Sequence, residues 1–336
     1  KWRHSGHARL TYSGLYPVIE ASVDFNDRAA RQYYACAYIQ DNGTGMEIRN
    51  TELSNPYLQG KLSMYIPWNF SDGGWYRGLI PKVTYTISND MFNTAMTMMS
   101  TRPEDGSVQG DPTFIGVTEG ENTIRQNVTA SLRGYTSMAT PNSAVYPRWG
   151  LGLEVGASTG LESYQYLAPM GYLYAYGYVP GLTRTQGLKL TASLQMKLRE
   201  DSYFSLPLID VLPRGLSSNA ALAQWLSIRN PQLAKFTADY AIPIYIGDIP
   251  LGGGCVYIKR MVLNPHFDYM KVGNKSLNSI GTELLFDLNR ALWIEWPCSI
   301  GATYSYNTGS GFKSIMSESG INMDRNHWGF VFNVSF

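Results

Sequence analysis

The sequence predicts an all-β protein, specifically a closed antiparallel transmembrane β-barrel of 14 or 16 strands. Segments of about ten residues alternate between apolar and polar side chains, which is the pattern of membrane-spanning strands. The chain holds 24 Tyr and 8 Trp in 336 residues, while only 16% of its residues are charged. No stretch approaches the roughly 18 to 20 consecutive apolar residues of a membrane-spanning helix. Strands in lipid must close into a barrel because unpaired backbone groups cannot be left in hydrocarbon, and single-chain bacterial barrels use even strand numbers.

The alternation is clearest in two segments, 188–198 and 328–336. In the first, leucine, alanine and methionine side chains alternate with lysine, threonine, serine and glutamine side chains. Successive side chains of a strand point to opposite faces. We therefore expect Leu190, Leu194, Phe330 and Val334 to face lipid. Gln195 is expected to face the lumen, where an added charge is tolerated.

Weaker copies of the pattern fill most of the remaining sequence, giving about fifteen candidate strands in all. In chain order, these weaker candidates are 7–13, 16–25, 31–40, 44–53, 57–68, 79–88, 122–135, 149–158, 166–178, 236–246, 256–269, 277–286 and 298–306. Tight turns are favoured at Asn26-Asp27, Asp41-Asn42-Gly43 and 71–74, and no helical pattern lies between the strands. A soluble sandwich or propeller is the alternative, but it requires a second protein layer over the tyrosine-rich apolar face of nearly every strand.

We interpret residues 1–336 as a single barrel domain. Two long segments, about 89–120 and 201–234, lack alternation and are expected to be extracellular loops or lumen plugs. The chain begins at Lys1 with no signal peptide. Because an outer-membrane protein must be exported, we expect the signal to lie outside this sequence, and a further N-terminal periplasmic domain stays an open alternative.

Composition and motifs argue against several functions. The net charge of +1 gives no electrostatic case for nucleic acid. The cysteines fit no metal-ligand spacing and the histidines fall in no catalytic motif; these residues are Cys36, Cys255, Cys298, His4, His7, His266 and His327. We therefore expect no enzyme activity, no cofactor and no metal.

The C-terminal strand carries aromatic side chains at Trp328, Phe330 and Phe332, and the chain ends on Phe336. This strand resembles the C-terminal signal by which outer-membrane barrels are recognised by the assembly machinery. The resemblance implies a location in the bacterial outer membrane.

Residues 212–216 carry an Arg214-Gly215 pair in the second long segment, and five candidate strands follow it. The second of these strands contains Phe267-Asp268. This arrangement resembles the last five strands of the Omp85 superfamily, which includes the barrel-assembly insertase and two-partner secretion translocases. The resemblance implies that the Arg-Gly loop folds back into the lumen. Leu216 stands where the family has an aromatic residue, and Tyr269 stands where it has glycine.

A second Arg-Gly-aromatic sequence, 133–135, fits the motif's letters, but it lies at the end of a candidate strand with about eight strands still to follow. Context therefore favours Arg214. Alternation turns Asn264, His266 and Asp268 inward. We expect Arg214 to pair with Asp268, because a desolvated charge needs a partner; the inward acids Glu154, Asp239 and Glu283 are the alternatives.

Two functions are compatible with these features. The first is an Omp85-like barrel acting in or alongside outer-membrane protein assembly or translocation, with a weak seam between its first and last strands. The second is a passive porin or a structural barrel subunit of a larger complex. Either one implies contact with outer-membrane lipid and lipopolysaccharide and with other outer-membrane or periplasmic proteins. Segments 76–81 and 146–150 also resemble barrels from the Bacteroidota.

Overall fold

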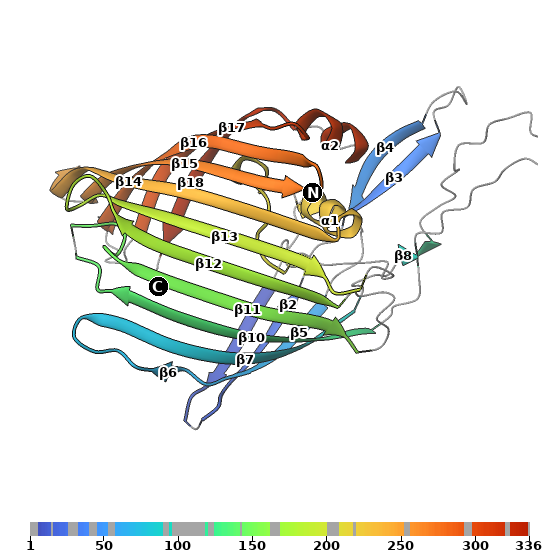
Figure 1. The fold of residues 1–336 in the computed structure, drawn as a ribbon, viewed down its shortest axis with the longest axis horizontal. Coiled ribbons are helices and arrows are strands. Elements are labelled where there is room, and N and C mark those ends of the chain that lie inside the picture. Colours follow the sequence, from blue (N-terminus) through green and yellow to red (C-terminus); the bar gives the residue numbers. More distant parts are fainter. Residues whose placement is uncertain are drawn as a thin grey trace, which may run out of the picture.

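A long, strongly curved antiparallel sheet forms most of the molecule (Figure 1). The computed structural model describes residues 6–14, 16–25, 33–39, 46–52, 58–89, 94–95, 118–119, 124–141, 143–161, 169–199, 208–217, 220–251, 256–291, 298–319 and 323–334. The strands of the main sheet are β1 (Gly6–Tyr12), β2 (Val18–Phe25), β5 (Leu58–Tyr65), β6 (Trp68–Asn69), β7 (Trp75–Asn89), β10 (Ile124–Met138), β11 (Gly150–Gly160), β12 (Met170–Pro180), β13 (Gly187–Lys197), β14 (Gln232–Leu251), β15 (Val256–Val272), β16 (Lys275–Ala291), β17 (Cys298–Thr308) and β18 (Asn326–Val334).

The sheet has 14 strands, of which the two-residue β6 pairs only with β7 and lies off the main path. Along that path, every strand is antiparallel to the next, from β1–β2 to β17–β18. The path from β1 to β18 contains an odd number of strands, so its two end strands run in the same direction. Direct pairing of β1 with β18 would therefore be parallel.

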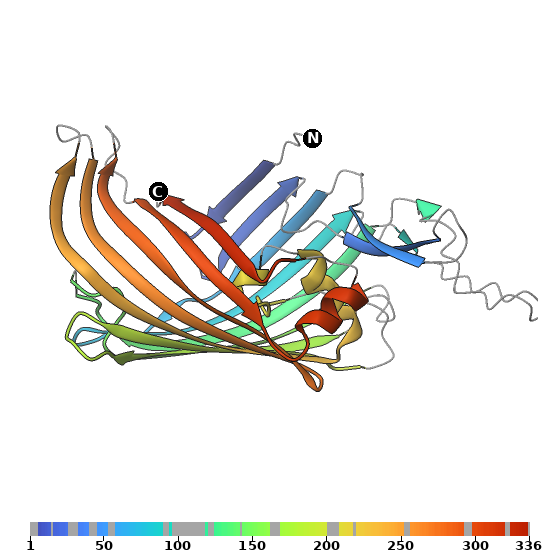
Figure 2. The ribbon, with the colours of Figure 1, turned by 90° about the horizontal axis from the view of Figure 1, so that it is seen from above.

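No pairing between β1 and β18 occurs among the described residues. The two strands are the free edges of the sheet and lie on the same side of the molecule (Figure 2). The sheet is antiparallel, as the alternation predicts. Its closure into a ring of 14 or 16 strands stays a prediction.

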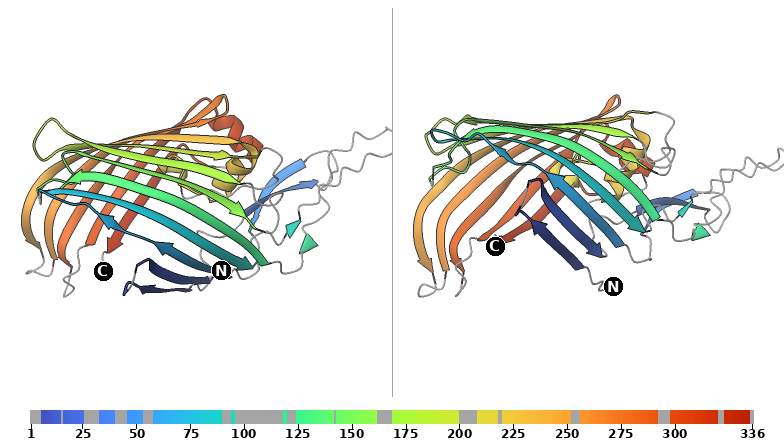
Figure 3. Two further views of the ribbon diagram at one scale, coloured as in Figure 1. Left: turned by 60° about the horizontal axis from the view of Figure 1, so that its bottom comes forward. Right: turned by 90° about the horizontal axis from the view of Figure 1, so that it is seen from below.

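Two predicted strands, 31–40 and 44–53, do not join the main sheet. They form β3 (Tyr33–Ile39) and β4 (Met46–Glu52), which pair only with each other. The reason is that β2 pairs directly with β5, so the chain between them has no edge left to join. The hairpin projects from one end of the molecule (Figure 3). Another short pair, β8 (Thr94–Ala95) with β9 (Thr118–Glu119), falls in the first long segment, which otherwise lies outside the described residues.

The expectation that no helix lies between the strands was wrong. The second long segment contains a 3₁₀ helix at Arg214–Leu216 and α1 (Ala220–Arg229), and α2 (Phe312–Ser319) connects β17 to β18. In α1, good helix formers such as Ala221, Leu222 and Gln224 dominate a sequence with no alternation. Neither α-helix in the described part of the chain has the length and apolar character that a membrane span requires.

The two faces of the sheet differ as the alternation predicts. Apolar side chains on the convex face are exposed, among them Leu62, Met64, Val83, Ile87, Leu132, Leu151, Leu153, Val155, Phe267, Trp328 and Phe330. Polar side chains on the concave face are buried, among them Gln59, Ser63, Thr86, Ser88, Asn127, Ser158, Thr191, Ser193, Thr237, Asn264 and Ser305. The surface that meets the surroundings is therefore apolar, and the polar side chains line the interior.

Gln195 faces inward, as expected. Its side chain is buried and accepts a hydrogen bond from the Leu208 backbone N–H at 2.7 Å. Tolerance of a charge at position 195 stays a prediction, and it requires the loop to keep its place without this bond.

The outward position beside it gives the first testable prediction. Leu194 lies two residues from the middle of β13, on the same face as the exposed Ala192, so Leu194→Arg puts a charge into the hydrocarbon. We expect a loss of roughly 2 to 4 kcal/mol in the free energy of unfolding from lipid vesicles, measured by urea titration. The control Leu194→Phe keeps an apolar side chain there and should change stability little. Equal losses in both variants would contradict the assignment of the convex face to lipid.

Candidate functional site

The Arg-Gly segment lies on the concave side of the sheet, where it is seated on strands β14, β15 and β16. Its 3₁₀ helix presents Arg214 to carboxylates from three consecutive strands: Asp239 on β14, Asp268 on β15 and Glu283 on β16. Asp268 lies opposite Thr237, two residues from Asp239, so these two acids are diagonal neighbours on one face. We call Arg214 and these three acids the arginine cluster.

Arg214 uses its backbone and all three guanidinium nitrogens in the arginine cluster. Its backbone N–H donates to Asp268 Oδ2 at 2.8 Å, and its Nε donates to the same oxygen at 3.3 Å. Nη2 donates to Asp268 Oδ1 at 3.1 Å and also to Asp239 Oδ1. Nη1 donates to Glu283 Oε1 at 3.3 Å. The paired contact with Asp268 uses the planar fork of donors that arginine has and lysine lacks.

Burial gives these contacts their strength. The Asp268 side chain is 0% exposed, Asp239 9%, Glu283 19% and Arg214 25%. Burial by itself would lower the pKa of Arg214, but the charges of Asp268 and Asp239 outweigh it and raise that pKa above its ordinary value. The guanidinium therefore stays charged. Removing it would leave three carboxylates together with little water to solvate them, which typically costs about 3 to 5 kcal/mol.

Gly215 fits its site because it has no side chain. A Cβ at this position would come within 2.2 Å of Asn307 Oδ1 and 2.6 Å of Asn307 Nδ2. Asn307 belongs to β17, is fully buried, and its Nδ2 donates to the Gly215 carbonyl at 3.3 Å. The glycine lets the loop backbone approach the wall of the sheet, which explains why Arg and Gly occur together.

The chain leading to Arg214 is held by a second ion pair. Lys235 Nζ, on β14, donates to Asp210 Oδ2 at 3.0 Å and to the Leu212 carbonyl oxygen. The Lys235 side chain is buried on the concave face. With the bond from Leu208 to Gln195, this pair fixes the loop at positions on both sides of Asp210.

A buried apolar cluster lies at one end of the interior, against β14, β15 and β16. It joins Val211, Leu212, Leu216, Leu222 and Leu226 from the loop and α1, Leu233, Met270, Val272 and Leu277 from the strands, and Phe312, Ile315 and Met316 from α2. We call this set the apolar plug. It lies at the end of the sheet where the long connections are, next to the projecting hairpin (Figure 1). A close-packed apolar core admits few waters, so the plug excludes water from the space that it fills.

On the other side of the arginine cluster, the interior contains a polar cavity of about 590 Å³. Lysines, acids and tyrosines line it, including Tyr146, Glu154, Tyr174, Lys189, Lys235 and Asp239. Tyr146 comes from the connection between β10 and β11, and burial, with the nearby Asp239 charge, raises the pKa of its phenol. The concave side thus carries an apolar cluster at one end and a polar cavity beside the arginine cluster.

The structure brings Arg214 together with Asp268, and also with Asp239 and Glu283 among the alternatives. Glu154 lines the polar cavity and does not join the arginine cluster; it accepts a hydrogen bond from Tyr172 Oη at 2.7 Å. Arg133 lies within β10, opposite Glu154, so the second Arg-Gly sequence belongs to a strand. In the described residues, no three His, Cys, Asp or Glu side chains form a group fit for a metal ion.

The predicted strand and assembly-signal residues lie apart from the arginine cluster. Phe267 is exposed on the convex face, as are Trp328 and Phe330. Phe336 and the side chain of Phe332 lie outside the described residues. Phe267 marks the register that turns Asp268 inward and makes no contact of its own with Arg214.

Asn307 and the apolar plug were not predicted from the sequence. The plug had a signal: Met270 and Val272 continue the inward series of His266 and Asp268, and Leu233 and Leu277 occupy inward positions on the neighbouring strands. When adjacent strands end in apolar residues on a face that is otherwise polar, another segment of the chain is expected to pack against those residues. Asn307 had no comparable signal, because polar inward residues are common on every strand.

The sequence matches no protein-family model and no curated protein. Among solved structures, the chain is similar to BamA from Haemophilus ducreyi lacking POTRA domains 1–3. The TM-score is 0.47 and the sequence identity 11%, and the match covers 98% of this chain and 62% of the BamA chain. The chain therefore spans less than two thirds of that BamA chain. Nothing in these comparisons supports the resemblance to Bacteroidota barrels.

A double-mutant cycle tests the arginine cluster. With Arg214→Ala and Asp268→Asn, we expect an interaction energy above about 0.5 kcal/mol in urea unfolding, because the two side chains bond directly. The matched control is Asp287→Asn on β16, whose carboxylate bonds Arg260 and Ser299 instead. Arg214→Ala with Asp287→Asn should be additive. Additivity in both cycles would show that Arg214 and Asp268 are not paired.

The fit of Gly215 gives another prediction. Gly215→Ala should lower the free energy of unfolding by about 1 to 3 kcal/mol, because its methyl group overlaps Asn307 in a packed site. Asn307→Ala removes the obstructing amide, so the double variant should recover stability relative to Gly215→Ala alone. A purely additive double variant would show that the loop does not press against β17.

Proposed function

We propose that this protein is an outer-membrane barrel of the Omp85 type, acting in or alongside outer-membrane protein assembly or translocation. The observation that carries the proposal is the Arg214-Gly215 tip, which folds into the interior and is held there by carboxylates of three strands and by Asn307. An Arg-Gly loop in this place is the feature that the resemblance to the superfamily implies. The exposed apolar convex face supports the location in the membrane.

The apolar plug weighs against a passive porin. A diffusion channel needs a continuous water-filled path, whereas here a packed cluster joins the loop, α1, α2 and the strand ends. In barrels of this class, long connections lie outside the cell and short turns in the periplasm. In that orientation the plug closes the extracellular end, and the polar cavity lies on its periplasmic side.

The free edges support a function in which strands pair with the barrel. Leu10 on β1 and Trp328 on β18 are each 73% exposed, and the two strands run in the same direction. A closed all-antiparallel ring therefore needs an odd number of further strands between them. Among the described residues, each edge has N–H and C=O groups outside any ladder, and such groups can template another strand.

Photo-crosslinking tests the function against a structural barrel. A photoreactive amino acid at Leu10 or Trp328 should yield adducts with newly made outer-membrane proteins that appear in a radioactive pulse and disappear in the chase. The same probe at Ala192, in the middle of the sheet, should yield none. Permanent adducts with one partner would favour a structural subunit, and adducts within the chain alone would contradict the proposal.

Conductance tests the porin alternative. Reconstituted wild-type protein should show little solute flux, while deletion of 208–230 should open the interior and raise the flux. A wild-type protein that conducts as freely as the deletion variant would overturn the plugged interior and leave the porin.

A further inference from the structure

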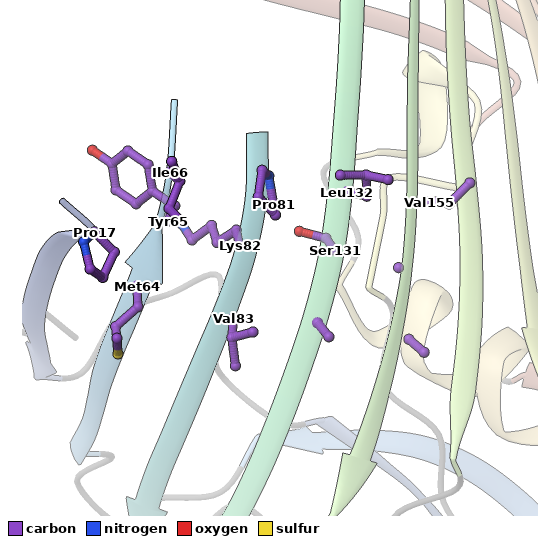
Figure 4. A pocket seen from close by; sticks show the side chains of 13 residues that line it. Pro17, Met64, Tyr65, Ile66, Pro81, Lys82, Val83, Ser131, Leu132 and Val155 are labelled. Carbon is purple, nitrogen blue, oxygen red and sulfur yellow. The ribbon is translucent and has the colours of Figure 1, made fainter. Parts of the chain in front are cut away.

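The convex face carries a hollow that the alternation of apolar and polar residues does not predict. The hollow has a volume of about 850 Å³, within the range of small-ligand sites, and spans β5, β7, β10 and β11 beside Pro17 (Figure 4). It lies away from the arginine cluster and shares no lining residue with the polar cavity.

Its shape follows from cross-strand pairing. One row of outward neighbours runs Met64, Val83, Ala130 and Ala157, so two alanines lie directly opposite each other. The next row runs Pro81, Leu132 and Val155. The short alanine side chains form the floor, and the longer ones form the rim. Figure 4 shows Val83, Leu132 and Val155 around the opening.

The lining offers an occupant almost nothing to hydrogen-bond. The backbone groups of these strands are already paired in the ladders. Lys82 alternates toward the concave face, and its Nζ lies 5.8 Å from the centre of the Tyr65 ring. An extended polypeptide segment would bring backbone N–H and C=O groups that must be satisfied in hydrocarbon, and this surface cannot satisfy them.

On β7 and β11 the hollow lies at mid-depth. Val83 is near the middle of β7 (Trp75–Asn89), and Val155 is at the middle of β11 (Gly150–Gly160). The other side of the hollow reaches Tyr65, the last residue of β5, and Pro17 in the β1–β2 connection. Headgroups lie at the ends of the spanning strands, so an occupant beside Val83 and Val155 meets the protein through its hydrocarbon part. The hollow is continuous with the exposed apolar band of the convex face.

We propose that this hollow binds one acyl chain of a bilayer lipid as a specific site. The proposal rests on the membrane location given under the proposed function. Burying methylene groups against Met64, Ala130 and Ala157 is favourable in itself, because it fills a space that tumbling lipid chains fill poorly. The site takes an apolar chain, because its lining is almost wholly apolar.

The test uses phosphatidylethanolamine vesicles containing a lipid with a diazirine at the middle of its acyl chain. After irradiation, peptides from β7, β10 and β11 should carry several-fold more lipid adduct than peptides from β12 and β13 at the same depth. Ala157→Phe should reduce this excess to the level of β13. The matched control Ala192→Phe, at an exposed alanine opposite Ala175, should leave it unchanged.

Uniform labelling around the wall in wild-type protein, or an excess that survives Ala157→Phe, would overturn the acyl-chain site. Disulfide-linked dimers of Ala157→Cys in the same vesicles would assign the hollow to a second copy and also overturn it. Insertion is measured separately, by protease protection in the vesicles. A protein that does not insert overturns the membrane location, whereas insertion with uniform labelling overturns only the acyl-chain site.

Discussion

One partly buried guanidinium shared by three carboxylates decides how the interior is organised. Asp239, Asp268 and Glu283 come from consecutive strands, and without a cation their repulsion would oppose the pairing of β14, β15 and β16. Arg214 can stabilise this arrangement only from the interior, so the loop that carries it must also lie inside. The register of three strands and the path of the loop therefore depend on each other.

The apolar plug depends on the same contact. Leu212 and Leu216 flank Arg214 and are buried against strand residues, so seating the arginine also buries its neighbours. The apolar side chains of the loop and the strands in the plug then form the surface against which α1 and α2 pack. Leu216 itself is fully buried in the plug.

Alternation made the sheet and its inward carboxylates predictable, because a period of two assigns each side chain to a face. It identified Asp268 and the three alternative acids, of which two join Arg214. Alternation could not show that the hairpin at 33–52 lies outside the main sheet. Two strands that pair only with each other can alternate as regularly as strands within a larger sheet. Nor could alternation find α1 and α2, whose short helices are stabilised by burial against residues far away in sequence. Asn307 was out of reach for the same reason: its role arises from a contact with Gly215, 92 positions earlier.

Amide hydrogen exchange at the loop tip tests most directly whether Arg214 is seated in the interior, on which the rest of the structure depends. The Arg214 N–H donates to a fully buried carboxylate, and the Leu216 N–H donates to Pro213 O at 2.9 Å. We predict that these two amides in the folded protein exchange as slowly as those in the middle of β15, and that Asp268→Asn speeds both. Exchange as fast as in an exposed loop would show that the loop lies in solvent, and would contradict the seating of Arg214.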